Sequence, residues 1–304
     1  MKKIIFTIIT LAMFVSACSK DEVIEITPDN AIDFGRIFVD NATKATDNTY
    51  SGNGELTSFN VYGTVTGIAG TVNIFDGIQV SGEVVNDEWS YEEQYNQYWI
   101  QGADYAFIAI VDANNVTKNG YNMPTAIIYN TEGQKDLLYA KSDVENAIAD
   151  QEAVNFTFNH LLSKAQFTVT SNANGGYYHT ITGIKVSNFE TGTYTIESEE
   201  WVGETSKEIE FGNVTEVTET SGPKTNDTQM LLIPNSDEFN VSFTVDLYKN
   251  KTKLGTENKT IKVNTDLLKG FAYNFIIECS VGNPIKFTVT NDPEWGGSTD
   301  INVL

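Results

Sequence analysis

The ionisable and nucleophilic residues of this 304-residue chain form no arrangement that favours catalysis or metal binding. Histidine occurs twice, at His160 and His179, and neither lies in a His-Glu-x-x-His or paired-cysteine pattern that would hold zinc. Because the chain has 41 carboxylates, neighbours such as Asp237 and Glu238 arise by chance and carry little evidence for glycosidase chemistry. There is also no Gly-x-Ser-x-Gly elbow and no calcium-loop spacing. The sequence therefore predicts a protein that is not an enzyme and that uses no cofactor or metal.

Cys18, in contrast, stands where a chemical modification is expected. Two lysines precede an apolar run from Ile4 to Val15, which is too short to span a bilayer as a mature helix. Residues 1–17 are therefore predicted to be a secretory signal. Their last residues with the cysteine, VSAC, resemble a bacterial lipobox, in which the chain is cut between Ala17 and Cys18 and the cysteine receives fatty acyl chains such as palmitate. Several acyl chains on one residue give stable membrane attachment.

The charge of the chain limits its partners. Nineteen Lys and Arg face 41 Asp and Glu, which gives a net charge of −22, and Arg36 is the only arginine. Such a surface repels nucleic acid and anionic lipid, so contact with a membrane must come through the acyl chains. The segment after Cys18, Ser19–Glu22, resembles the acidic export tag of lipoproteins on the outer face of certain gut and oral anaerobes. We therefore expect a lipid-anchored protein on the surface of an outer membrane.

One aromatic stretch, residues 88–110, could bind a sugar. Its members Trp89, Tyr91, Tyr95, Tyr98 and Trp99 could form a platform on which pyranose rings stack. The alternative is that alternating members face the core of a β-sandwich while the others cover its edge. We favour the core, and keep a surface glycan-binding lipoprotein as the second hypothesis for function.

The elements that must position these residues are mostly strands. Apolar and polar residues alternate in segments 58–65, 73–80, 166–171, 191–197, 239–248 and 285–290. This period predicts half-buried antiparallel strands, which at such spacing form a sandwich or a barrel. A single short helix is predicted at 141–151, where Ser142 and Glu145 match a capping box. The length allows two domains, and we place their boundary near residues 152–165.

Several segments taken together resemble a known family, the fimbrillin (Mfa-like) lipoproteins that build the type V pili of such anaerobes. They occur in the same order, at 54–65, 99 with 105–113, 156–172, 231–235, 269–281 and 285–297. The resemblance implies an all-β fold of two transthyretin-like, Greek-key β-sandwich domains in tandem, at 18–155 and 156–304. It also implies a structural or adhesive subunit of a fimbrium, with other pilin subunits and a host or bacterial surface ligand as partners.

The resemblance further implies a mechanism of assembly. Family members are exported as lipoproteins and then cut by an arginine- or lysine-specific protease, which removes the lipid and the first β-strand. Removal of this strand leaves a groove with unpaired backbone groups and exposed apolar side chains. An extended strand from another subunit then fills the groove. In this sequence the candidate first strand is 31–40, with Ile32, Phe34, Ile37 and Val39 as its apolar contacts.

Two positions are candidates for the cut. The family often carries arginine in a Thr-Arg-Ala-Thr-like segment after the first strand, whereas the matching segment here, ATKAT at 42–46, has Lys44. A protease specific for arginine could cut only at Arg36, inside the strand. Either the protease accepts Lys44, or the protein keeps its strand and lipid and acts as an anchor or accessory subunit.

The C-terminal segment could supply the strand given to a neighbour. Apolar residues alternate at 285–290 and again in the last four residues, where Ile301, Val303 and Leu304 are the candidate donor side chains. A proline and two glycines lie between these stretches, and such residues would let the last stretch swing out as an arm.

Overall fold

The computed structural model describes residues 30–39, 56–83, 88–148, 150–226, 228–292 and 299–301. Within these ranges the chain forms nineteen strands and two short 3-10 turns, η1 (Glu93–Tyr95) and η2 (Thr131–Gly133). The all-β fold class is therefore confirmed. In the same ranges, no helix is long and apolar enough to cross a membrane.

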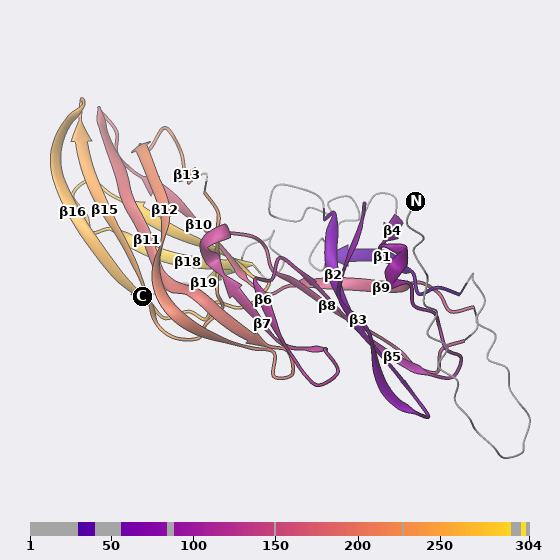
Figure 1. Cartoon of the computed structure of the whole chain (residues 1–304). Coiled ribbons are helices and arrows are strands. Elements are labelled where there is room, and N and C mark those ends of the chain that lie inside the picture. The colour runs from indigo at the N-terminus through magenta and orange to yellow at the C-terminus, as the bar shows by residue number, and fades with distance from the viewer. Residues whose placement is uncertain are drawn as a thin grey trace, which may run out of the picture.

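The first half of the chain closes into a ring of strands (Figure 1). Each strand lies antiparallel to its neighbours, except that the first and last strands of the ring are parallel. Aromatic and aliphatic side chains fill the interior as one cluster. The order around the ring is β1 (Phe34–Val39), β4 (Glu88–Ser90), β3 (Gly70–Glu83), β2 (Ser58–Gly67), β5 (Asp104–Val111), β8 (Leu138–Val144) and β9 (Val154–His160).

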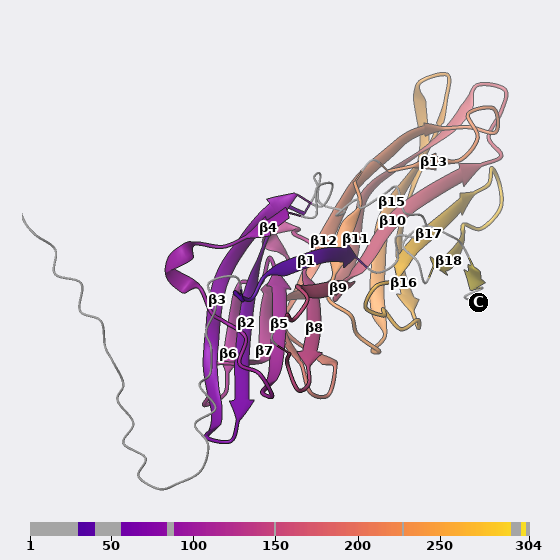
Figure 2. The same cartoon turned by 90° about the vertical axis from the view of Figure 1, so that its right-hand side faces the viewer.

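The second half is built on two sheets with a separate apolar cluster formed by side chains of both. One sheet has the order β13 (Lys224–Thr225), β10 (Ser163–Ser171), β17 (Ala272–Cys279), β18 (Lys286–Asp292) and β19 (Thr299–Ile301), with β14 (Met230–Leu232) also paired to β10. The other has the order β16 (Thr252–Val263), β15 (Phe239–Lys249), β11 (Tyr177–Thr195), β7 (Pro124–Asn130) and β6 (Asn115–Lys118), with β12 (Glu200–Val217) paired to β11. Figures 1 and 2 show the ring and this sandwich side by side in an elongated molecule.

The two halves are joined by a shared sheet and a third apolar cluster. Strands β6 and β7 follow β5 in sequence, yet β7 pairs with β11 of the sandwich. Apolar side chains from the outside of the ring, such as Tyr62 and Ile108, pack in this cluster with Tyr194 of the sandwich. The expected boundary between residues 155 and 156 falls inside β9, and the division into two domains stays a prediction.

The helix predicted at 141–151 is wrong, because β8 occupies Leu138–Val144. All seven residues of β8 pair with β5, and Leu138 and Ala140 are fully buried. A capping signal contributes only about 1 kcal/mol to a helix. Cross-strand pairing and burial of the apolar side chains outweigh it here.

Candidate assembly site around strand β1

Strand β1 lies between β4 and β9, which do not pair with each other in the described part of the chain, and so closes the ring. Phe34 is opposite Trp89 of β4 on one side and Val154 of β9 on the other. The residues just before β1 are held as well, since the Ile32 N–H donates to the Gln97 carbonyl at 2.8 Å. Segment 30–39 is therefore a seam, and the ring has no other connection between β4 and β9 within the described part of the chain.

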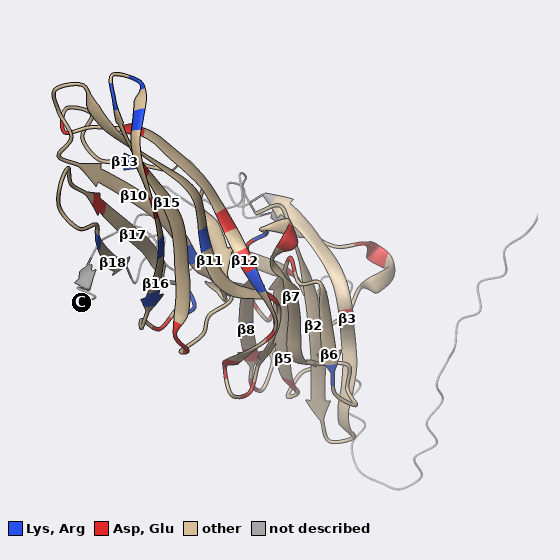
Figure 3. Ribbon diagram, turned by 90° about the vertical axis from the view of Figure 1, so that its left-hand side faces the viewer, with Lys and Arg blue, Asp and Glu red and all other residues tan. Residues whose placement is uncertain are grey.

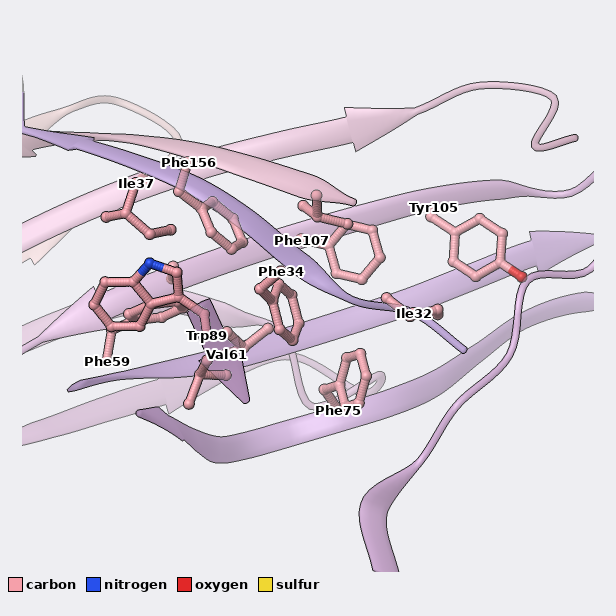
Figure 4. Close-up of a cluster of buried hydrophobic side chains, with 14 of the residues drawn as sticks. Ile32, Phe34, Ile37, Phe59, Val61, Phe75, Trp89, Tyr105, Phe107 and Phe156 are labelled. Atoms are coloured by element: carbon pink, nitrogen blue, oxygen red, sulfur yellow. The ribbon is translucent and has the colours of Figure 1, made fainter. Parts of the chain in front are cut away.

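The apolar side chains of this segment form the centre of the ring's core. Ile32 is 0 % exposed and Phe34 and Ile37 are each 3 % exposed, while Val39 is partly buried against the same cluster. Figure 4 shows Phe34 surrounded by aromatic side chains. Its ring centroid lies 5.7–6.4 Å from those of Phe59, Phe75, Tyr91, Phe107 and Phe156.

A β-bulge in β1 determines which way Arg36 points. From Phe34 to Ile37 the strand advances three residues while β9 advances two, from Val154 to Phe156. The extra residue shifts the inward face from the even positions 32 and 34 to the odd positions 37 and 39. Arg36 is consequently exposed rather than buried in the core.

Asn155 of β9 fits this bulge. Its Oδ1 accepts a hydrogen bond of 2.7 Å from the Arg36 N–H, so the backbone group displaced from the ladder keeps a partner. Gly35 lies close to the same amide, and a Cβ at Gly35 would stand 2.6 Å from the Asn155 Oδ1. The sequence does not predict that Asn155 binds the backbone of β1, because a polar residue at an outward position of a strand normally faces only solvent.

Tyr91 also ties segment 30–39 to its surroundings. Its hydroxyl donates a 2.8 Å hydrogen bond to the Ile32 carbonyl, and its ring lies 5.5 Å from that of Phe75. Burial raises the pKa of Tyr91 to about 12, so the phenol stays protonated and remains a donor at physiological pH.

The aromatic platform kept as an alternative at residues 89–99 does not form. Trp89 is 7 % exposed and Trp99 is 3 % exposed, and both belong to the core of the ring together with the partly buried Tyr91. Only Tyr95, at 46 %, and Tyr98, at 36 %, are exposed. Three of the rings thus lie in or against the core and two lie at the surface, so the five side chains share no face.

The other predicted site residues are only partly described. Cys18, Ala17, Lys44, Val303 and Leu304 lie outside the described residues. Ile301 ends β19, which lies at one end of its sheet and is opposite Val289 of β18. The donor stretch is thus seen for one residue, paired within its own chain.

The histidines and the remaining cysteine have structural surroundings. The His160 Nδ1 lies 2.8 Å from the Asp136 Oδ2, with both side chains buried. His179 is bonded through Nδ1 to the Ser171 hydroxyl at 2.7 Å, and burial lowers its pKa. Burial raises the pKa of Cys279 to about 12, which makes its thiol a poor nucleophile. No group of three or more His, Cys, Asp or Glu is placed to hold a metal ion in the described part of the chain.

Charged side chains are spread over both halves of the molecule (Figure 3). Many of the lysines are paired with carboxylates on neighbouring strands, such as Lys207 with Glu190 at 2.6 Å and Lys185 with Glu210 at 3.1 Å. These pairs are at least partly exposed, so solvent screens them and each contributes little to stability. They stabilise strand pairing modestly and do not form a chemical site.

Solved structures show the same fold. A fimbrial protein from Bacteroides vulgatus ATCC 8482 is 15 % identical with a TM-score of 0.65, and the match covers 88 % of this chain and 99 % of that one. A candidate cell adhesion protein from Bacteroides uniformis ATCC 8492 is 15 % identical with a TM-score of 0.54, again over 88 % and 99 % of the two chains. Another from Bacteroides ovatus ATCC 8483 is 16 % identical with a TM-score of 0.53, over 90 % and 98 %. At these identities the likeness shows the fold alone.

Sequence comparison identifies the family directly. No curated protein matches the sequence. Residues 43–293, however, match the family described as fimbrillin-like, and this range takes in most of the ring and of the sandwich. The chain therefore belongs to the fimbrillin-like family.

Proposed function

We propose that this chain is a fimbrial subunit that is exported as a lipoprotein and joins its neighbours by exchange of strand β1. Membership of the fimbrillin-like family supports a fimbrial structural role at the cell surface, in assembly with other subunits, rather than an enzymatic one. The single observation that carries the finer proposal is the seam. One six-residue strand closes the ring and places Phe34 at the centre of its core.

Loss of β1 would be costly unless another strand replaces it. Its removal exposes the apolar surface covered by Ile32, Phe34 and Ile37, at about 1.5–3 kcal/mol for each side chain. The backbone hydrogen bonds to β9 and to residues 97–99 add about 0.5–1.5 kcal/mol each. A donor strand that restores both would be held firmly, before the costs of association are subtracted.

Arg36 is a poor place for the cut in the folded protein. A protease must draw the chain around the scissile bond out into its own active site. The Arg36 N–H is bonded to Asn155, and the next residue, Ile37, is buried in the core. We therefore propose that processing occurs at Lys44, which would leave β1 on the released fragment.

The test uses the fact that the chain has a single arginine. An arginine-specific protease should leave the folded protein intact, whereas a lysine-specific protease should produce a fragment that ends at Lys44, as read by mass spectrometry. Lys44→Ala should prevent that cut, and Arg36→Ala should not. Cutting at Arg36 in the folded protein would contradict the assignment of the site.

The donor strand is proposed to be the C-terminal arm with Ile301, Val303 and Leu304. Its described part, β19, is held by only three paired residues at the edge of a sheet, so release requires few hydrogen bonds to break. Deletion of 301–304 should leave a folded monomer that no longer polymerises after cutting, as judged by negative-stain microscopy. Polymers of normal length from the deletion variant would rule out this donor.

The lipid anchor is proposed from the sequence alone, and its test is separate. Cys18→Ala should abolish acylation and move the protein out of the detergent phase, because the acyl chains are the proposed attachment to the outer membrane. Equal partitioning of the variant and the wild type would exclude a lipoprotein. If the wild type is acylated but never processed at Lys44, it belongs among the anchor or accessory subunits.

A further inference from the structure

Within the described part of the chain, strand β3 is paired along only one of its edges for most of its length. On one side β2 pairs with it from Gly70 to Ser81, whereas on the other side β4 pairs only with Ser81–Glu83. Beside the remaining edge lies a groove of about 680 Å³, walled on its far side by the chain from Ser90 to Tyr95. This volume falls within the range of about 300–1,000 Å³ that small-ligand sites have.

The shape of this edge disfavours an added β-strand. Two residues of β3, Ile74 and Gly77, have no opposite residue on β2 and mark two bulges within four positions. Gly77 has a φ of +78°, and the exposed Asp76 stands beside it. Bulges and charges are the means by which proteins keep edge strands from pairing with other chains. The groove is therefore better suited to a ligand that is not an extended peptide.

The lining of the groove combines hydrogen-bonding groups with tyrosine rings. Asp76 and Gln79 project from β3, while Glu92, Tyr91 and Tyr95 come from the facing segment. Carboxylates and amides hydrogen-bond adjacent hydroxyl groups, and a ring face packs against the C–H groups of a sugar. Among the described residues that line the groove, none is a lysine or an arginine. This composition matches a neutral carbohydrate and would repel an anionic one.

Hydrogen bonds within the protein hold side chains on both sides of the groove in place without a ligand. The Asp76 carboxylate accepts hydrogen bonds from Lys118 at 2.6 Å and from Asn122 at 3.3 Å. On the opposite wall, the Tyr91 hydroxyl is bonded to the Ile32 carbonyl and its ring packs on Phe34. Groups held in place in this way lose little freedom on binding, which favours affinity.

We propose that this groove binds a neutral carbohydrate, with the 46 % exposed ring of Tyr95 as its stacking surface and Asp76, Gln79 and Glu92 as partners of sugar hydroxyls. Of the five aromatic residues of segment 89–99, Tyr91 and Tyr95 line the groove. Trp89 and Trp99 are in the core, and Tyr98 is exposed outside the groove. It does not depend on strand exchange, because every wall is present in the uncut chain.

The experiment exposes the purified, uncut protein to an array of neutral oligosaccharides and of sialylated and sulfated ones. Animal glycoprotein glycans and bacterial surface polysaccharides form separate arms, so a hit also gives the source of the sugar. A neutral hit is then titrated by isothermal calorimetry against the wild type, Tyr95→Ala and Glu92→Gln. Tyr98→Ala is the matched control, because Tyr98 is an exposed tyrosine of the same segment that does not line the groove.

We expect a neutral oligosaccharide whose Kd rises about tenfold or more in Tyr95→Ala and in Glu92→Gln and stays unchanged in Tyr98→Ala. Both substituted side chains are exposed, so the variants should keep the wild-type circular dichroism spectrum. Binding of acidic glycans alone, or of no glycan, would overturn the proposal. Wild-type affinity in Tyr95→Ala would also overturn it, and none of these results bears on polymerisation.

Discussion

The ring and the sandwich are both closed around apolar cores, but they are closed in different ways. The sandwich is built on long pairs, antiparallel between strands that are neighbours in sequence, such as β11 with β12 and β15 with β16, and parallel between β10 and β17 over eight paired residues. The ring is completed by β1, which lies parallel to β9 and is separated from it by more than a hundred residues of chain. A short strand without a hairpin partner can leave without unravelling its neighbours. This difference supports our proposal that the ring is the half that accepts a strand from a neighbour.

The largest expected effect concerns the side chain at the centre of the ring. Phe34→Ala should lower the free energy of unfolding of the ring by about 3–5 kcal/mol, since it leaves a cavity among five aromatic rings. Phe38→Ala is the matched control in the same strand, because Phe38 is 50 % exposed and should change stability by about 0.5 kcal/mol or less. Hydrogen exchange resolved by peptide would locate the effect.

In Phe34→Ala, faster exchange should be confined to the ring, and added peptide with the wild-type sequence of residues 30–39 should slow it again. Equal loss of protection in the ring and the sandwich would show that the two halves unfold together. In that case β1 could not be exchanged without loss of the whole fold.

A smaller effect comes from the asparagines that join strands in the two halves. Asn226 is 6 % exposed and connects the two sheets of the sandwich, accepting from the Phe167 N–H at 2.7 Å and donating to the Phe211 carbonyl at 3.0 Å. Asn226→Ala should cost about 1–3 kcal/mol because it leaves buried backbone groups without partners. Asn155→Ala, at the exposed bulge of β1, should cost about 0.5–1.5 kcal/mol.

Urea unfolding of the two variants would measure this difference. The order matters more than the values, since a larger loss in Asn155→Ala than in Asn226→Ala would mean that the seam is the more rigid connection. That result would count against release of β1. We expect the larger loss in Asn226→Ala, because Asn226 joins the sheets of the sandwich through buried hydrogen bonds. Asn155 holds β1 in the ring through a hydrogen bond at the protein surface.

Sequence patterns predicted much of the fold because alternation reports directly on burial. The period of two placed strands correctly at 58–65, 73–80 and 239–248. It could not reveal the bulge in β1, which turns Ile37 rather than Arg36 toward the core. The helix at 141–151 failed because local capping preferences are weaker than pairing with β5, which no local pattern reveals.

The candidate sites were less accessible to sequence reasoning. The sequence pattern of residues 89–99 does not indicate which aromatic rings face the core. In the structure, Trp89 and Trp99 are buried in the core of the ring. The groove beside β3 arises because β4 has only three residues, so that among the described strands most of this edge of β3 has no partner. Such gaps depend on the register of distant strands, as does the bond between Asn155 and Arg36.

The smallest expected effect is a dependence of the sandwich on pH. His179 of β11 is 4 % exposed and is bonded to Ser171 of β10, and burial lowers its pKa below the ordinary value of 6.5. In the unfolded chain the imidazole therefore takes up its proton at a higher pH than in the folded protein. The contribution to stability is complete above about pH 6.5 and is lost progressively as the pH falls toward the lowered pKa of the folded state.

Urea midpoints at pH 7.5 and pH 5.5 should consequently differ more for the wild type than for His179→Gln, which cannot take up the proton. Peptide-resolved hydrogen exchange should place this difference in the sandwich, and an equal pH dependence in both proteins would show that His179 is not its source.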